Sequence, residues 1–236
     1  MNPTLKALSA LLVYPTADIQ QVAPAIGNAL EADKLIPARI RAELRKLVDE
    51  LAGGDLYDLQ ERYVLLFDRT RSLSLHLFEH VHGESRDRGQ AMIDLKAQYE
   101  QAGLLMSATE LPDFLPLFLE YLSTRPLREA CETLGQPAHI FAALAERLRK
   151  RQSSYEAVFR ALVALSAAKP KDEEVSALLQ LPDPDATDLA ALDAAWEDEP
   201  VTFGPGAGDG CKDGLIARVR GALRPAPDMQ RPNPRS

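Results

Sequence analysis

The feature that most limits the fold of this chain is a series of helix-forming segments with marked starts and ends. The pattern is clearest in residues 37–54, PARIRAELRKLVDELAGG. Pro37 suits the first position of a helix, whereas Gly53 and Gly54 suit its end. The apolar side chains between them recur at the spacing of one helix face: Ile40, Leu44, Leu47 and Leu51. This segment is therefore predicted to form an amphipathic helix.

Comparable segments recur to about residue 168. One covers residues 87–103. The others begin near Asp55, near Ser107 or Thr109, at Pro126, at Pro137 and at Ser153 or Ser154. One stretch, RSLSLHLF, instead alternates leucines at positions 73, 75 and 77, as a strand would. Because a lone strand has no partner, we interpret this stretch as a helix. The sequence thus predicts an all-α fold, with a single helical-bundle domain over residues 1–170.

Residues 171–236 differ in composition from the helical part. All ten charged residues between positions 172 and 200 are acidic, and residues 182–236 hold eight of the 17 prolines and six of the 13 glycines. Such a segment buries too little apolar surface to offset its ordering entropy. We predict a largely disordered, flexible acidic tail over residues 171–236. Within it, residues 189–204 are either a short partner-binding motif or a stretch that packs back on the domain.

Charge and hydropathy exclude several classes of function. The net charge is −8, and because residues 172–200 hold ten acids and no lysine or arginine, the rest of the chain is close to neutral and lacks the basic face that nucleic acid requires. No stretch approaches about 18 uninterrupted apolar residues, and the N-terminus has no signal-peptide pattern. We therefore expect a cytoplasmic protein without direct membrane insertion. Cys131 and Cys211 belong to no C-x-x-C pair, and we expect unpaired thiols.

Three of the four histidines lie within residues 74–89, SLHLFEHVHGESRDRG. The order His76-x-x-Glu79-His80 matches the ligands of inverted zinc peptidases. On a helix these side chains share one polar side, where two histidines four residues apart can hold a metal. A peptidase also needs a third protein ligand, and His139 belongs to no motif that supplies one. We expect no metal and no catalytic residue here, with a zinc-dependent hydrolase as the alternative.

The segment SATELPDFLPLFLEYLS, residues 107–123, is more apolar than one buried helix face requires. Apolar side chains nearly surround the predicted helix: Phe114, Leu115, Leu117, Phe118, Leu119, Tyr121 and Leu122. A central helix wrapped by its neighbours explains this surplus. Alternatively, part of the surface lines a groove for an amphipathic peptide, together with Tyr63, Leu66 and Phe67.

Three separated motifs resemble a known family: ERYVLLFDRTRSLSLHLFEHVHGESRDRGQAMIDL, LPDFLPLFLEYLS and WEDEPVTFG. They occur in the same order in NarJ-type chaperones, which assemble the molybdenum cofactor of respiratory nitrate reductase and are also called its delta subunits. The likeness runs from about residue 5 to residue 204. It implies membership of the redox-enzyme maturation chaperones, which are all-helical cytoplasmic proteins and not enzymes.

The resemblance implies a specific client. The expected partner is the apo catalytic (alpha) subunit of nitrate reductase, bound chiefly through its N-terminal peptide. The chaperone would assist molybdenum cofactor insertion before the subunit docks at the membrane, and we expect it to hold no cofactor of its own. A helical adaptor within a stable complex is the remaining alternative.

The resemblance also implies candidate site residues. The segment YVLLFD, residues 63–68, agrees with the family pattern, as do the histidine cluster and Gly83. The wider group carries an E-x-P-D-H motif beside its peptide groove. Here ELPDF keeps the acid, proline and aspartate with a different first spacing, and Phe114 replaces the histidine. The predicted client-binding residues are Tyr63, Leu66, Phe67, His76, Glu79, His80, Glu110, Pro112, Asp113, Phe114 and Phe118.

Overall fold

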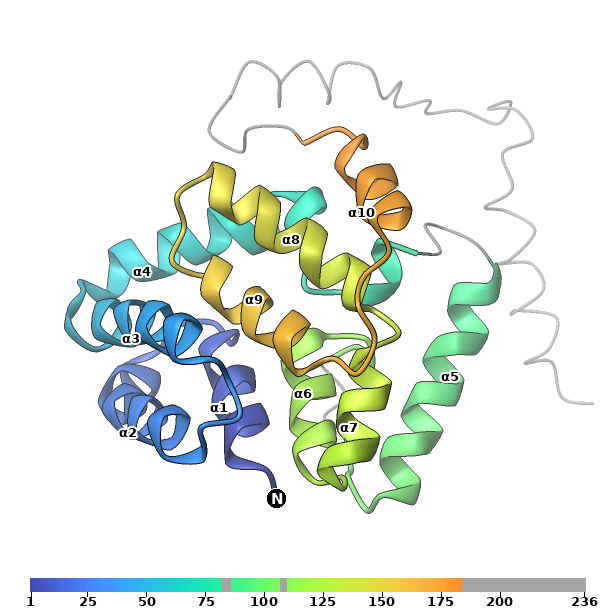
Figure 1. Ribbon diagram of the computed structural model, residues 1–236, viewed down its shortest axis with the longest axis horizontal. Coiled ribbons are helices and arrows are strands. Elements are labelled where there is room, and N and C mark those ends of the chain that lie inside the picture. Colours follow the sequence, from blue (N-terminus) through green and yellow to red (C-terminus); the bar gives the residue numbers. More distant parts are fainter. Residues whose placement is uncertain (82–85, 107–109, 184–236) are drawn as a thin grey trace, which may run out of the picture. The chain divides into compact units, whose positions relative to one another are not determined.

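The computed structural model describes residues 1–81, 86–106 and 110–183 (Figure 1). Its α-helices are α1 (Pro3–Leu11), α2 (Ala17–Asp33), α3 (Ala38–Gly53), α4 (Leu56–Tyr63), α5 (Arg86–Gln101), α6 (Leu115–Ser123), α7 (Leu127–Leu134), α8 (Ala138–Lys150), α9 (Glu156–Leu165) and α10 (Asp172–Leu179). Within these residues the only β pairing is an isolated bridge between His76 and Phe114. The predicted all-α fold is confirmed.

Several helices begin at capping residues that the sequence provides. The side chain of Asn2 accepts a hydrogen bond from the backbone N–H of residue 5, and Asp55 accepts two from the first turn of α4. Pro126 and Pro137 directly precede α7 and α8. The side chains of Asn2 and Asp55 thus satisfy N–H groups that have no partner inside the helix, whereas the two prolines make no side-chain cap.

The helices pack against one another in sequence order and across it (Figure 1). α1 contacts α2 and α6, α2 contacts α3, and α9 contacts α3, α7 and α8. α5 lies beside α6, where the rings of Tyr99 and Tyr121 meet at 4.8 Å. None of the described helices has the length and apolar character needed to cross a bilayer.

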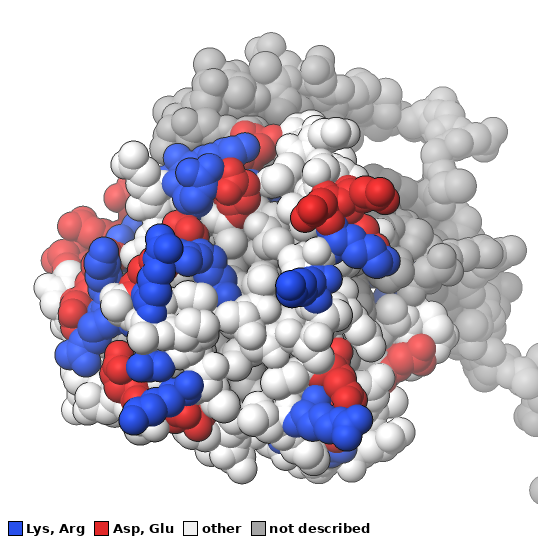
Figure 2. All heavy atoms as spheres, viewed as in Figure 1, with Lys and Arg blue, Asp and Glu red and all other residues white. Residues whose placement is uncertain are grey.

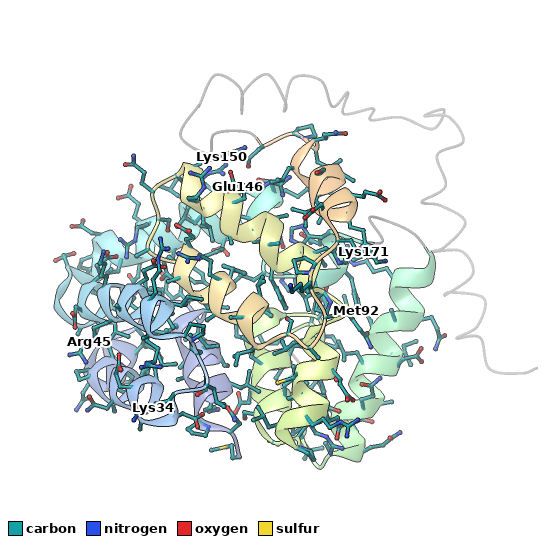
Figure 3. The ribbon with its side chains drawn as sticks, in the orientation of Figure 1. Lys34, Arg45, Met92, Glu146, Lys150 and Lys171 are labelled. Carbon is teal, nitrogen blue, oxygen red and sulfur yellow. The ribbon has the colours of Figure 1, made fainter. Side chains whose placement is uncertain are left out.

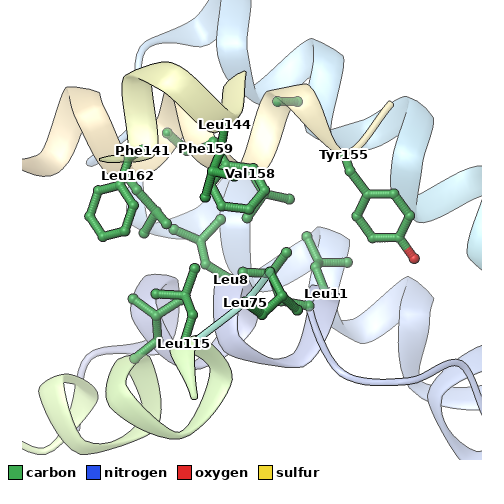
Figure 4. Close-up of a cluster of buried hydrophobic side chains, with 14 of the residues drawn as sticks. Leu8, Leu11, Leu75, Leu115, Phe141, Leu144, Tyr155, Val158, Phe159 and Leu162 are labelled. Carbon is green, nitrogen blue, oxygen red and sulfur yellow. The ribbon is translucent and has the colours of Figure 1, made fainter. Parts of the chain in front are cut away.

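The centre of the core lies where α1, α6, α8 and α9 meet (Figure 4). These helices contribute the fully buried side chains of Leu8, Leu115, Phe141 and Phe159, in that order. Leu75, from the irregular segment after α4, packs into the same cluster. Full burial of a Leu or Phe side chain contributes about 1.5–3 kcal/mol to the free energy of folding. This cluster therefore stabilises the packing of helices that are distant in the sequence.

The face that carries α3, α8 and α9 bears charges of both signs (Figure 2). Arg160 pairs with Glu43 of α3, and Arg149 pairs with Glu146 on α8. Glu146 and its neighbour Lys150 lie near the C-terminal end of α8 (Figure 3). These pairs neutralise much of the positive charge on this face. Exposed pairs of this kind contribute little stability, about 0–1 kcal/mol each.

The segment that follows α4 departs from the predicted helix. α4 continues into a π-helical turn, Val64–Asp68, in which the N–H of Arg69 donates to the carbonyl of Val64. Two 3₁₀ turns follow, η2 (Arg71–Leu73) and η3 (Leu77–Glu79), and the backbone between them is not helical. The prediction of a helix over residues 71–78 was therefore wrong.

The alternating leucines of this segment indicated that its backbone is extended and not helical. Leu73, Leu75 and Leu77 are all buried, and the backbone between η2 and η3 is extended. Their partner comes from residues 113–115, where the N–H of Leu115 donates to the carbonyl of Leu75 at 2.8 Å. A lone extended segment is therefore stable here, because a distant loop supplies the pairing that the local sequence lacks.

The helical packing continues beyond residue 170. α10 packs against α8, and Leu178 is buried there. The described part of the predicted tail, up to Asp183, is therefore mostly a packed helix instead of a flexible chain. The acids at its start, residues 172–174, suit the first turn of a helix, and this signal was overlooked. Residues 184–236, with the predicted motif at 189–204, lie outside the described residues.

Phe67→Ala is expected to lower the free energy of unfolding by about 3–5 kcal/mol, because it removes a buried ring from the core. The ring of Phe67 packs edge-to-face against Tyr63 at 5.0 Å and Tyr155 at 5.1 Å. Chemical denaturation measures the change. Tyr57→Ala is the control, since Tyr57 is 80% exposed on α4, and it should cost less than about 0.5 kcal/mol. A loss below about 1 kcal/mol for Phe67→Ala contradicts this placement.

Candidate functional site

A groove of about 490 Å³ lies between α5 and the helices that face it. One wall is a single face of α5, formed by Ala91, Asp94, Leu95 and Gln98. The floor and the other wall come from η3, α6 and the α7–α8 junction: Leu77, Phe78, Val81, Phe118, Thr133, Gln136, Pro137, His139 and Ile140. The volume lies within the range of protein ligand sites, about 300–1,000 Å³. We call this feature the α5 groove.

The wall formed by α5 follows from helical spacing. Its four lining residues lie at positions i, i+3, i+4 and i+7 and so share one face over about 10 Å of helix. Ile93, which lies on another face, is 63% exposed. Tyr99 fastens the C-terminal part of α5, because its hydroxyl donates to the carbonyl of Pro112 at 2.8 Å. Burial raises the pKa of Tyr99, which keeps this hydroxyl protonated as a donor.

The floor of the α5 groove is held in place by Asp113. Its side chain is fully buried, and one carboxylate oxygen accepts a hydrogen bond from the N–H of Phe78 at 3.1 Å. The other oxygen lies 3.1 Å from Nδ1 of His76. The carbonyl of Asp113 also accepts from the N–H of Leu77 at 3.1 Å. Because a buried carboxylate must have such partners, Asp113 fixes the positions of Leu77 and Phe78.

The two histidines of the cluster lie in different environments. The hydrogen bond to Asp113 is the main cause that raises the pKa of His76, and partial burial opposes it. Burial is the main cause that lowers the pKa of His80, although its Nε2 lies 2.9 Å from the carbonyl of Ser74 and donates to it. The pKa values of His76 and His80 are therefore shifted in opposite directions. Each ring fastens the irregular segment to a different acceptor.

The geometry of the histidine cluster does not match the zinc hydrolase alternative. His76 precedes the 3₁₀ turn η3 and His80 follows it, so the two rings do not lie one helical turn apart. Glu79 lies 3.5 Å from Arg88 of α5. Among the residues that the structure describes, no group of three His, Cys, Asp or Glu side chains is arranged to hold a metal ion.

The predicted site residues fall into three places. Tyr63, Leu66 and Phe67 are buried away from the α5 groove, and the hydroxyl of Tyr63 donates to the carbonyl of Leu12 at 2.9 Å. Phe118 is buried and lines the groove. The remaining residues lie at or near the segment under the groove floor: His76, Glu79, His80, Glu110, Pro112, Asp113 and Phe114.

These remaining residues differ in exposure. The rings of His76 and Phe114 contact each other at 5.4 Å, and both are half-buried. Pro112 and Asp113 are buried, whereas Glu110 is exposed. None of them is a lining residue of the α5 groove. The structure thus brings the ELPDF motif and the histidine cluster together, but as the support of the groove floor.

Several lining residues were missed at the level of sequence. Ala91 and Leu95 lie one helical turn apart, and this spacing was a usable signal for the apolar wall of α5. Phe78 and Val81 lie next to the histidine cluster, but no sequence pattern singled them out as lining residues. The α7–α8 junction gave no signal, because its lining residues Thr133 and Gln136 are polar and resemble an ordinary surface turn.

The fold places the chain in a known structural class. A solved structure from Archaeoglobus fulgidus, described as a candidate redox enzyme maturation protein, matches it with a TM-score of 0.51. The match covers 69% of this chain and 91% of that chain at 22% sequence identity. This likeness concerns the fold alone, and it shows that the chain shares the fold of that structure.

Sequence comparison identifies the family. Residues 33–161 match the family described as nitrate reductase delta subunit. The nitrate reductase molybdenum cofactor assembly chaperone NarJ of Escherichia coli K12 is 44% identical over 94% of both chains. The probable chaperone NarW of the same strain is 46% identical over 84% of this chain and 83% of its own length. A probable NarJ of Bacillus subtilis 168 is 31% identical over 68% of this chain and 86% of its own.

The chain therefore belongs to the nitrate reductase delta subunit family. Its relatives are named as chaperones of cofactor assembly, so it is a maturation chaperone and not an enzyme. The resemblance inferred from the three sequence motifs is confirmed.

An NMR titration should place the pKa of His76 above, and that of His80 below, the ordinary value of about 6.5. With a raised folded pKa, the pair of His76 with Asp113 stabilises the fold fully below about pH 6.5, and this contribution is lost as the pH rises through the raised pKa. The contribution of His80 is fully present above about pH 6.5 and is lost as the pH falls through its lowered pKa.

The single variants His76→Gln and His80→Gln assign the two resonances in this titration. The two pKa values in the reverse order, or a single shared value, contradict the geometry described for the histidines.

Proposed function

We propose that the chain binds the N-terminal peptide of the apo catalytic (alpha) subunit of nitrate reductase in the α5 groove, and so assists molybdenum cofactor insertion before that subunit docks at the membrane. The observation that carries this proposal is the groove itself, whose walls are mainly apolar and come from five separate elements. Family membership supplies the client, because the relatives are named as nitrate reductase assembly chaperones.

The shape of the groove suits an amphipathic helix. Apolar side chains line both walls, with Leu95 on α5 and Phe78, Phe118 and Ile140 opposite. At about 25 cal/mol per Å², burial of about 500 Å² of apolar surface supplies about 12 kcal/mol. Ordering costs of about 4 kcal/mol or more reduce this to micromolar affinity or weaker. Such reversible binding suits a chaperone that must release its client.

The charge of the groove adds specificity for a basic client. Asp94 is the one carboxylate among the lining residues, and none of them is lysine or arginine. Asp94 is exposed and accepts a hydrogen bond from Gln90 one turn earlier on α5, at 2.7 Å. A lysine or arginine on the polar flank of the bound helix therefore meets an acceptor in this wall. An exposed pair of this kind contributes about 0.2–1 kcal/mol.

A stable adaptor and a chaperone differ in which form of the enzyme they bind. A chaperone binds the immature catalytic subunit and leaves once the cofactor is inserted. We therefore expect the full-length chain to capture the cofactor-free subunit and not the mature reductase. Equal capture of both forms instead supports the helical adaptor.

Phe78→Ser and Leu95→Ser should each weaken binding of the client N-terminal peptide by about tenfold or more, because each removes apolar surface from one wall. Isothermal calorimetry with a synthetic peptide measures the affinity, and circular dichroism checks that the variants fold. Ile93→Ser is the matched control, since Ile93 lies on the exposed side of α5. Wild-type affinity in both groove variants places the peptide elsewhere.

Asp94→Asn should weaken binding of the same peptide by about two- to fivefold at low salt. The difference from wild type should shrink as salt increases, because exposed charges separated by more than about 8–10 Å are screened at physiological ionic strength. Calorimetry at two salt concentrations tests this, with Asp58→Asn on α4 as the control. An unchanged affinity at low salt removes Asp94 from the recognition of the client.

A further inference from the structure

A buried cation ties three separate elements together. The side chain of Arg147 on α8 is 2% exposed, and no carboxylate of the described chain lies within ion-pair distance of it. Its Nη1 donates to the carbonyl of Ser72 in η2 at 2.7 Å, and its Nη2 donates to the carbonyl of Leu178 in α10 at 2.6 Å. Because an unpaired buried charge is costly, Arg147 depends strongly on these two acceptors.

The acceptor in α10 belongs to its last turn. The last four carbonyls of a helix have no partner inside the helix, and cations are favoured at this end. Arg147 therefore caps α10 from the side of α8. If α10 leaves α8, Arg147 keeps one of its two acceptors, and its Nε already has no partner. The docked position of α10 and the position of the guanidinium are thus linked.

A second link runs through Asp183, just after α10. Both terminal nitrogens of Arg151, the residue directly after α8, donate to its carboxylate, at 2.8 and 2.7 Å. The hydroxyl of Ser72 donates to the same carboxylate. Partial burial raises the pKa of Asp183, but the bonds from Arg151 and Ser72 outweigh it and lower the pKa overall. Ser72 is therefore held by both Arg147 and Asp183.

The backbone leads from Ser72 to the floor of the α5 groove within a few residues. Leu73 and Leu75 are fully or nearly fully buried, so this stretch is wedged into the core. Leu77 and Phe78 then form the groove floor. Because the stretch lacks the internal hydrogen bonds of a regular helix, its position depends on groups of other elements, among them the backbone N–H of Leu115, which donates to the carbonyl of Leu75. One end is held by Arg147 and Asp183, and the other end by Asp113.

We propose that Arg147 and Asp183 are positioning residues for the α5 groove, and that docking of α10 on α8 is coupled through Ser72 to binding of the client peptide. This inference rests on the proposed function for its ligand. Such coupling is reciprocal: if docked α10 raises client affinity by some factor, the bound client favours docked α10 by the same factor. Typical couplings of this kind are about 5–150-fold.

Asp183→Asn in the full-length chain is the central test, because Asp183 lies outside the groove and outside the core. Hydrogen exchange at the backbone N–H groups of Leu77 and Phe78, measured without client, reports on the floor. Calorimetry with the synthetic client peptide reports on binding. We expect faster exchange at both positions and an affinity that falls at least about fivefold. The thermal midpoint should change little, because the side chains of Asp183 and Arg151 remain partly exposed and ion pairs near the surface contribute little stability.

Two further variants make the test specific. Glu173→Gln also removes a negative charge from this region, but Glu173 is exposed on α10 and should leave both measurements unchanged. Arg147→Lys keeps the charge but lacks the planar fork whose two nitrogens each reach one carbonyl, and it should shift both measurements in the same direction as Asp183→Asn. If Arg147→Lys does not fold, comparing Asp183→Asn with Glu173→Gln in both measurements still tests the coupling.

The outcomes separate this inference from the proposed function. If wild type binds the peptide and Asp183→Asn leaves exchange or affinity unchanged, the coupling is wrong. A fall in affinity without faster exchange also overturns it, since the effect then bypasses the floor. If wild type does not bind the peptide, the proposed function fails and the coupling to that client fails with it. Faster exchange in Asp183→Asn then still shows that Asp183 positions the floor.

Discussion

The buried carboxylate of Asp113 is the interaction on which the described site depends. The segment after α4 is not a helix, so its backbone N–H groups must find partners elsewhere. Asp113 supplies them for Leu77 and Phe78 and also meets the ring of His76. The same loop pairs with Leu75. One aspartate thereby turns a stretch without regular structure into a rigid groove floor. The ELPDF motif and the histidine cluster act together as a support, and the lining comes from their neighbours.

The sequence predicted those parts of the fold that local rules control. Amphipathic spacing, as in residues 37–54, and capping residues such as Asp55 gave the all-α architecture correctly. Interactions between distant segments could not be predicted. Leu75 pairs with Leu115, and Arg147 caps α10, and neither partner is marked in the local sequence. The family motifs pointed to the segment under the floor of the α5 groove, but not to the side chains that line this groove. Tyr63 belongs to the core, and the wall on α5 was missed.

The arrangement suits a chaperone better than a catalyst. Within the described residues, the charged and polar groups near the groove, such as Asp113 and His80, are engaged in holding the backbone. The surface left for a ligand is mainly apolar, with the carboxylate of Asp94 in one wall. Binding of this kind is reversible and tolerant of sequence, and it requires no cofactor. These properties fit a protein that shelters a peptide during assembly and then releases it.

The most direct test of the central claim is site-specific photo-crosslinking in cells that express the cofactor-free catalytic subunit. A crosslinking amino acid at Val81, which is 52% exposed at the groove, should capture the N-terminal peptide of that subunit. The same group at Tyr57, on α4, should not. Crosslinks to the peptide from Tyr57 but not from Val81 would contradict the assignment of the α5 groove as the client site.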